Sequence, residues 1–170
     1  MEINNNHIRK YPIGIQSFEN LRREGYLYVD KTALIYRLIT TGKPYFLSRP
    51  RRFGKSLLLS TLKAYFEGKK ELFEGLAIEK LEKQWAVHPV LHLDLNAEKY
   101  DSVERLEMQM NSQLLNWESQ YGCDAKDWTY SIRFMNVIKA AYEQTGQQVV
   151  VLIDEYDKPM LESLHDKELR

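Results

Sequence analysis

The stretch YFLSRPRRFGKSLLLSTL, residues 45–62, constrains the fold of this chain more than any other segment. It passes from a short apolar run through a basic loop into apolar residues at helical spacing. The loop ends in Gly54-Lys55-Ser56, the last three residues of the phosphate-binding pattern G-x-x-x-x-G-K-[ST], and Arg49 stands at the position of the first glycine. Such a loop holds phosphate between a strand and a helix, because loop amides and the helix N-terminus together supply positive potential.

The residues on either side of the loop predict that context. Residues 45–48 form a short strand candidate, and the residues that follow Lys55 place an apolar face along a helix that ends near Gly68. In this geometry Lys55 would reach the β- and γ-phosphates of a nucleotide, and Ser56 would bind Mg²⁺.

A second signal lies about 100 residues later, where the apolar run 149–153 is followed by Asp154 and Glu155. Consecutive β-branched residues predict a strand that is buried on both faces. A strand that ends in adjacent carboxylates suits nucleotide hydrolysis, with Asp154 holding the water shell of Mg²⁺ and Glu155 polarising the attacking water. The alternative is an acidic turn after a buried strand, since Asp157 follows closely.

The remaining periodicities predict helices and strands that alternate along the chain. Strands separated by helix-length segments need crossover connections, so the sequence predicts an α/β fold with a mostly parallel sheet flanked by helices. We predict a helix over 17–24, capped by Ser17, and a helix over 30–42, capped by Asp30. A helical excursion at 69–86 follows, with Leu72, Phe73, Leu76, Ile78 and Leu81 turned inward, and 89–95 form a strand. The last two predicted helices are 131–145 and one that starts at Asp101, whose buried stripe consists of Val103, Leu106, Met110, Leu114 and Trp117.

The composition gives no general affinity for polyanions or membranes. Lys plus Arg and Asp plus Glu are both 24, so any basic site must be local. Cys123 is the single cysteine, which excludes an internal disulfide framework and fits a reducing compartment. The polar N-terminus lacks the apolar core of a signal peptide, and no apolar run is long enough to cross a bilayer. We therefore expect a cytoplasmic protein without membrane partners.

Three segments together resemble the predicted AAA-ATPase-like family: FLSRPRRFGKSLLLSTLKAYFEGKKELFEGL, the upstream YPIGIQSFENLRREGYLYVDKT and the downstream VVVLIDEYDKP. The similarity extends from about residue 11 to about residue 159, and arginine at the first-glycine position is the form that this family uses. The resemblance implies a P-loop ATPase fold, with ATP and Mg²⁺ as ligands. It also implies that Gly54, Lys55 and Ser56 contact phosphate and Mg²⁺, with Asp154 and Glu155 as the second acidic motif. We therefore predict metal ligands at Ser56 and Asp154 and catalytic residues at Lys55 and Glu155. The candidate nucleotide contacts are Arg51, Arg52, Phe53, Gly54, Lys55, Ser56 and Leu57.

Some features of the loop and of the segment before it stay open at this point. Arg49, Arg51 and Arg52 add charge around a triphosphate, face an acidic partner or form a solvated basic turn. The family segment YVDKT, 28–32, either lines the base side of the nucleotide or is structural, with Asp30 capping a helix.

The predicted organisation is an N-terminal helical lead-in, 1–44, before a P-loop ATPase core, 45–170, which ends soon after the Asp-Glu strand. In the family such a domain commonly precedes a domain that resembles PD-(D/E)XK nucleases. We therefore expect ATP binding or hydrolysis to act on a partner or nuclease-like domain of a longer protein. We expect this chain alone to hydrolyse ATP only weakly. The alternatives are a degenerate P-loop scaffold or nucleic-acid-binding module without turnover, and a phosphotransferase. If the chain is an ATPase domain, nucleic acid is at most an indirect partner. Assembly into an oligomer stays open.

Overall fold

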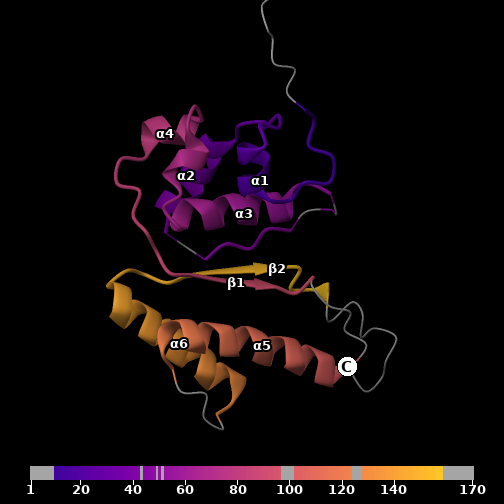
Figure 1. The fold of residues 1–170 in the computed structure, drawn as a ribbon, viewed down its shortest axis with the longest axis vertical. Helices are drawn as coiled ribbons and strands as arrows, with labels where there is room; N and C mark the ends of the chain where they lie inside the picture. The colour runs from indigo at the N-terminus through magenta and orange to yellow at the C-terminus, as the bar shows by residue number, and fades with distance from the viewer. Residues whose placement is uncertain are drawn as a thin grey trace, which may run out of the picture. The chain divides into compact units, whose positions relative to one another are not determined.

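The computed structural model describes residues 10–42, 44–48, 50, 52–96, 102–123 and 128–158. These residues form helices and a small parallel sheet, as expected for an α/β protein (Figure 1). Two compact units divide the chain, Met1–Ala86 and Val87–Arg170, called here the N-terminal and the C-terminal unit. The elements are α1 (Phe18–Arg23), α2 (Thr32–Thr40), α3 (Lys55–Phe66), the 3₁₀ helix η1 (Lys70–Phe73), α4 (Ala77–Leu81), β1 (Val90–Asp94), α5 (Val103–Tyr121), α6 (Tyr130–Thr145) and β2 (Val150–Asp154).

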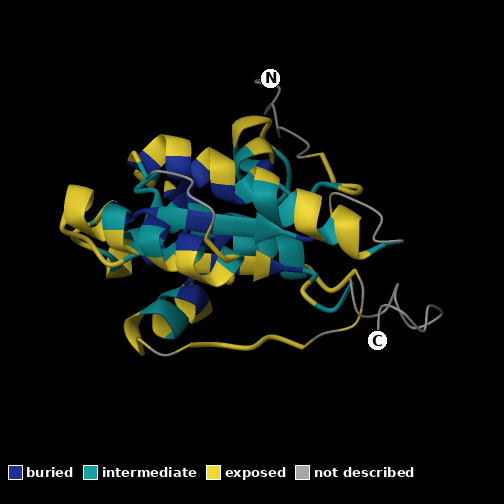
Figure 2. Ribbon diagram, turned by 90° about the horizontal axis from the view of Figure 1, so that it is seen from below, coloured by how far each residue is buried: buried dark blue, intermediate teal, exposed yellow. Residues whose placement is uncertain are grey.

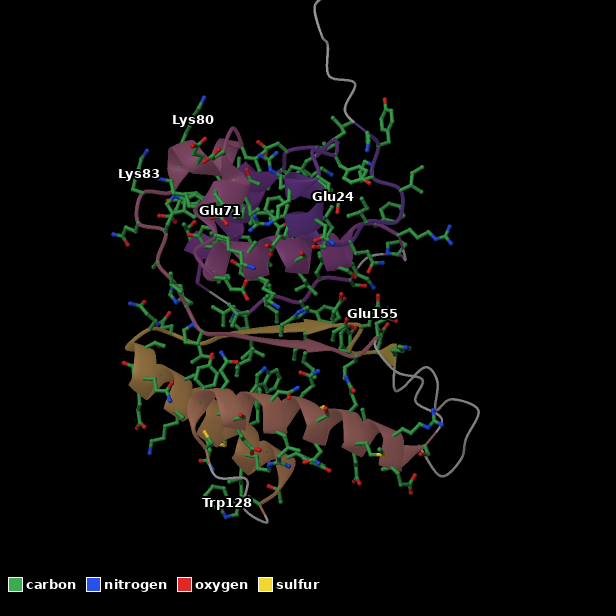
Figure 3. All side chains as sticks on the ribbon, viewed as in Figure 1. Glu24, Glu71, Lys80, Lys83, Trp128 and Glu155 are labelled. Atoms are coloured by element: carbon green, nitrogen blue, oxygen red, sulfur yellow. The ribbon has the colours of Figure 1, made fainter. Side chains whose placement is uncertain are left out.

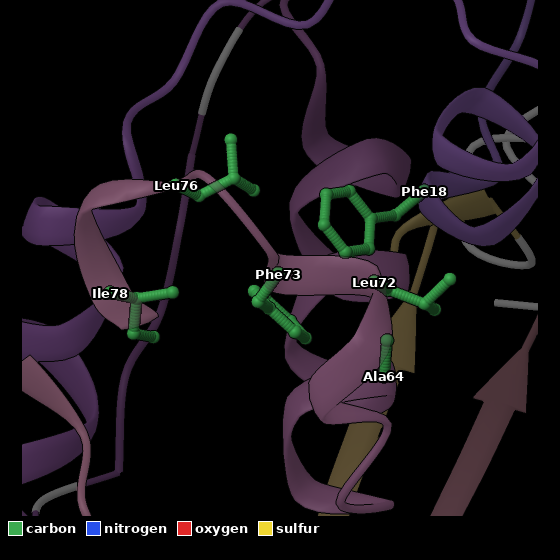
Figure 4. Packing of buried hydrophobic residues seen from close by; sticks show 6 residues of the cluster. All are labelled: Phe18, Ala64, Leu72, Phe73, Leu76 and Ile78. Carbon is green, nitrogen blue, oxygen red and sulfur yellow. The ribbon is translucent and has the colours of Figure 1, made fainter. Parts of the chain in front are cut away.

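The N-terminal unit packs its short helices around a core of large apolar side chains. Ser17 caps α1 as predicted, because its hydroxyl accepts a hydrogen bond from the amide of Asn20 at 3.2 Å. Phe18 and Phe73 lie fully buried with their ring centroids 4.9 Å apart. Figure 4 shows these rings with the smaller residues around them; the cluster consists of Phe18, Ala64, Leu72, Phe73, Leu76 and Ile78. Helices this short depend on such packing, because they are marginal in isolation.

Asp30 and Thr32 join the starts of α2 and α4. One carboxylate oxygen of Asp30 accepts from the amide and the hydroxyl of Thr32 at 2.8 and 2.6 Å, and the other accepts from the amide of Ala77 at 2.7 Å. The buried Thr32 hydroxyl accepts in turn from the amide of Ile78 at 3.0 Å. The predicted cap at Asp30 is therefore displaced: Lys31 holds the N-cap position, and Asp30 serves the first turn from one residue earlier.

The C-terminal unit consists of a parallel pair of strands with α5 and α6 on one of its faces (Figure 1). Leu91 of β1 is fully buried against the two helices, in a cluster with Leu114, Trp117, Tyr121, Val137 and Ala141. Between the helices, Arg133 places two nitrogens on the two carboxylate oxygens of Glu118, each at 2.7 Å. Both side chains are buried, so the pair fixes how α5 meets α6.

The predicted strand at 45–48 is wrong. These residues form no ladder, and their side chains are exposed, with Phe46 at 70% and Tyr45 at 53% of full accessibility. In the described part of the chain the sheet consists of β1 and β2 alone. A short apolar run becomes a strand only when a neighbouring strand pairs with its amides and carbonyls, and among the described residues no strand forms such a ladder with 45–48.

Several predicted burial patterns also need correction (Figure 2). Val151 and Ile153 of β2 are 38% and 47% exposed, so β2 is not buried on both faces; parallel strands reach that state only when both faces are covered. Leu81 is exposed because α4 ends at that residue, and Val103 is exposed because α5 begins there. Ser102 caps α5, whereas the predicted cap Asp101 lies outside the described residues.

The other elements agree with the sequence. Helix α3 begins at Lys55, β1 occupies the centre of the predicted strand 89–95, and α6 ends at the C-cap Gly146. Leu72, Phe73, Leu76 and Ile78 are buried as predicted. The predicted boundary between a lead-in, 1–44, and a P-loop core, 45–170, stays a prediction. No helix within the described ranges has both the length and the apolar character that a membrane span requires.

Candidate functional site: a phosphate-type loop and an acidic strand end

The backbone of the loop before α3 is left-handed at two positions. Gly54 is the N-cap of α3 and lies in the left-handed region, with φ +74°, and Arg52 also has a positive φ of 67°. The first hydrogen bond of the helix runs from the amide of Leu58 to the carbonyl of Gly54 at 3.0 Å. Amides of the turn before that bond are the ones that a helix start can offer to phosphate.

The body of α3 is anchored in the N-terminal unit, which keeps its N-terminus in place. The hydroxyl of Ser60 accepts from the amide of Phe18 at 2.9 Å, and Thr61 is buried with its hydroxyl on the carbonyl of Leu57 at 2.8 Å. Leu57 packs its side chain against the apolar core of the unit. Of the predicted nucleotide contacts, Leu57 can therefore contribute only its backbone.

The side chains of the loop differ in exposure. Arg52 is exposed and Phe53 is 63% exposed, whereas Lys55 and Ser56 are partly buried at the first turn of α3. Arg49 and Arg51 lie outside the described residues. The loop thus gathers Arg52, Gly54, Lys55 and Ser56 at one helix start, as the spacing in the sequence requires.

The acidic end of β2 lies in the C-terminal unit (Figure 3, Glu155 labelled). Asp154 is buried, at 7% exposure of the residue, and one of its carboxylate oxygens accepts from the amide of Glu155 at 3.0 Å. Glu155 has a positive φ of 52°, so the chain turns sharply where the strand ends.

Asp94 is a residue at this strand end that the sequence analysis missed. It is the register partner of Asp154, and the amide of Leu95, the next residue, donates to the carbonyl of Asp154 at 3.1 Å. The signal was present in the sequence, because HLDLN repeats the arrangement of an apolar strand followed by an aspartate. Two parallel strands that end in register necessarily bring such residues to one edge of the sheet.

The loop before α3 and the end of β2, each taken by itself, carry side chains of the kind that bind Mg²⁺ and nucleotides. Ser56 and Asp154 offer oxygen atoms, which Mg²⁺ prefers, and it keeps water and phosphate as further ligands. No group of three or more His, Cys, Asp and Glu side chains among the described residues could hold a metal by itself.

Comparisons with known proteins extend over nearly the whole chain. The model of a family described as Predicted AAA-ATPase matches residues 12–170. The "Uncharacterized protein in vnfD 5'region" of Azotobacter chroococcum mcd 1 is 41% identical over 162 residues, which are 95% of this chain and 31% of that protein. The chain thus spans less than one third of this relative's length. No solved structure matches the chain.

Proposed function

Because the chain belongs to the predicted AAA-ATPase family, we propose that it is an ATPase-like domain that binds Mg-ATP through Gly54, Lys55 and Ser56. The observation that carries this proposal is the position of Gly54, in a left-handed conformation at the N-cap of α3, directly before Lys55. In this proposal, the amides of the helix start and the ammonium group of Lys55 bind the same anion.

The loop residues have separate roles in this proposal. The amides around Gly54 hold the phosphate chain, and Lys55 contacts the β- and γ-phosphates as a point charge. Arg52 adds positive potential at the rim of the site, because it is exposed and precedes Gly54 by two positions. Phe53 and Leu57 contribute backbone amides. A role for Arg51 as a further phosphate contact remains part of the proposal.

The acidic residues serve the metal and the water. Bound Mg²⁺ neutralises charge on the β- and γ-phosphates. Ser56 supplies a hydroxyl ligand from the first turn of α3, and Asp154 holds the water shell of the metal from the end of β2. Glu155 polarises the attacking water as that water approaches the γ-phosphate. The support for this division is that Asp154 is a buried residue with a hydrogen-bonded carboxylate, whereas the next residue, Glu155, is more accessible.

Coupling to another domain is a further part of the proposal. The chain spans 31% of its curated relative, so a longer protein would give ATP binding or hydrolysis a partner domain to move. The family resemblance of the sequence favours a nuclease-like domain as that partner. In the full-length context the protein is then an ATPase, with assembly into an oligomer and cytoplasmic localisation as further expectations.

A second candidate is a degenerate P-loop that acts as a scaffold or contacts nucleic acid. The observation in its favour is the exposed Arg52 in the arginine-rich stretch RPRR. Basic residues that neutralise nucleic-acid phosphates give binding that weakens steeply with salt.

Titration calorimetry separates the two candidates. The proposed function predicts saturable binding of ATP that is tighter with Mg²⁺ than with a chelator, and little affinity for single-stranded or duplex DNA. Salt-dependent DNA binding together with no heat from Mg-ATP would support the scaffold and overturn the ATPase-like function. Lys55→Ala should lose the binding of Mg-ATP, and Lys63→Ala, in the last turn of α3, is its matched control and should keep it.

A further inference from the structure

The turn after β2 is held by hydrogen bonds at both of its ends. At its start, the amide of Glu155 donates to the carboxylate of Asp154 at 3.0 Å. At its end, the amide of Lys158 donates to the carbonyl of Glu155, also at 3.0 Å. Glu155 itself has a φ of 52°, a conformation that a residue with a side chain keeps only where its surroundings enforce it.

Lys158 ties this turn to the end of the neighbouring strand. Its ammonium nitrogen lies 3.0 Å from the backbone carbonyl of Asn96, which follows β1. The amide of Asn96 in turn donates to the carboxylate of Asp94 at 2.8 Å. Because Asp94 and Asp154 are register partners, the two turns start from the same edge of the sheet. The contact of Lys158 therefore closes a bridge between them across a sequence separation of 62 residues.

From this bridge we infer that Lys158 is a positioning residue for Glu155. The inference rests on the proposed function, in which Glu155 polarises the attacking water. An ammonium group that donates to a carbonyl forms a charge-assisted hydrogen bond. It holds the far end of the turn, so the left-handed residue at the start of the turn cannot relax and swing its carboxylate away.

The turn contains other charged groups, and their effect is distinct from that of the bridge. Asp157 and Glu155 are the acidic neighbours of Lys158 along the chain, and a positive charge at 158 lowers the repulsion between them whatever its exact contacts. A lysine-to-arginine exchange keeps this charge and keeps donors that can reach the carbonyl of Asn96. A methionine keeps the apolar stem and removes both.

The test uses the protein at its full encoded length and measures two quantities for each variant. These are the dissociation constant for Mg-ATP and the rate constant of hydrolysis in a single turnover at saturating Mg-ATP. We expect Lys158→Met to lower the rate constant about 10- to 100-fold, because a misplaced catalytic group loses that much, and to leave the dissociation constant within about twofold. Lys158→Arg should recover most of the rate. Lys139→Met, an exposed lysine of α6, should change neither quantity.

A double variant shows whether Lys158 acts through Glu155. In a Glu155→Gln background, the additional change Lys158→Met should have no effect on the rate, because the group that it positions is already gone. An equal loss of rate in both backgrounds would overturn the inference, as would wild-type hydrolysis by Lys158→Met. Hydrolysis by the wild type no faster than by Glu155→Gln would also overturn it, while Mg-ATP binding would still support the proposed function. Absence of Mg-ATP binding would overturn both.

Discussion

Asp94 and Asp154 are register partners at the ends of two parallel strands, and the amide of Leu95 donates a hydrogen bond to the carbonyl of Asp154. This relationship joins two acidic residues that lie 60 positions apart in the numbering of the chain. It gives the C-terminal unit one defined acidic edge, where the candidate metal ligand Asp154 has a neighbour of the same charge.

The two aspartates should differ in their effect on metal-dependent binding. Asp154→Asn should remove most of the gain in ATP affinity that Mg²⁺ provides, because the amide cannot hold the metal's water shell as a carboxylate does. Asp94→Asn keeps an acceptor for the amide of Asn96 and should keep that gain. The measurement is the ratio of ATP dissociation constants with Mg²⁺ and with a chelator. Equal ratios in the two variants would argue against Asp154 as the metal-binding residue.

Gly54→Ala should weaken ATP binding at a small cost in stability. A Cβ at Gly54 would meet no atom within 4 Å, so the strain comes only from its φ of 74° and amounts to about 1–2 kcal/mol. Gly122→Ala is the matched control, because Gly122 also caps a helix, has a φ of 66° and has open space around its Cβ position. Urea unfolding should show similar losses for both variants. ATP titration should show weaker binding for Gly54→Ala alone, and an equal effect of both would contradict the assignment of the loop.

Asp30 should stabilise the N-terminal unit in a way that depends on pH. Burial alone would raise the pKa of Asp30, but the hydrogen bonds from Thr32 and Ala77 outweigh it and lower the pKa below its ordinary value of 3.8. A lowered pKa in the folded state means stability that is complete above the unfolded-state pKa and is lost as the pH falls through the folded-state pKa.

Asp30→Asn should therefore lower the free energy of unfolding by about 1 kcal/mol at pH 7, the usual effect of losing a helix-start acceptor. The difference from the wild type should shrink as the pH falls below about 4. Urea unfolding at several pH values measures it, with Glu74→Gln as an exposed control of equal charge change. A difference that stays constant down to pH 3 would mean that the carboxylate charge contributes nothing.

The buried pair of Glu118 and Arg133 should be sensitive to the loss of one partner. Glu118→Gln leaves the guanidinium of Arg133 without its counter-charge, and we expect a loss of about 3–5 kcal/mol in the free energy of unfolding. The hydrogen bond from Arg133 to Asn111, at 2.6 Å, does not replace that charge. The double change Glu118→Leu with Arg133→Met should recover most of the loss. A single-variant loss below about 1 kcal/mol would indicate a pair that is solvated in solution.

Local signals in the sequence predict where helices begin and end. Ser17 caps α1, α3 begins at the lysine of the GKS motif, and α6 ends at Gly146. Each of these results depends on hydrogen bonds within a few residues, so the sequence near the helix end is sufficient to predict it.

Long-range partners explain what the sequence could not predict. Residues 45–48 have the composition of a strand, but composition does not supply the neighbouring strand that pairing requires. The exposure of Val151 and Ile153 depends in the same way on what covers the sheet. Each aspartate follows an apolar run in the sequence, but predicting that Asp94 pairs with Asp154 requires the register of two strands that are far apart in the chain. The roles of Lys55, Ser56 and Glu155 stay predictions, since they depend on a ligand.

Ligand-induced stabilisation of the wild type and of Lys55→Ala is the most direct test of the central claim, that Mg-ATP binds at the loop before α3. At a ligand concentration about 100 times the dissociation constant, Mg-ATP should raise the free energy of unfolding of the wild type by about 2.7 kcal/mol. Lys63→Ala, in the same helix, should show the same gain. In Lys55→Ala the gain should fall close to zero under the same conditions. A gain in Lys55→Ala equal to that of the wild type would contradict the account and place the nucleotide elsewhere.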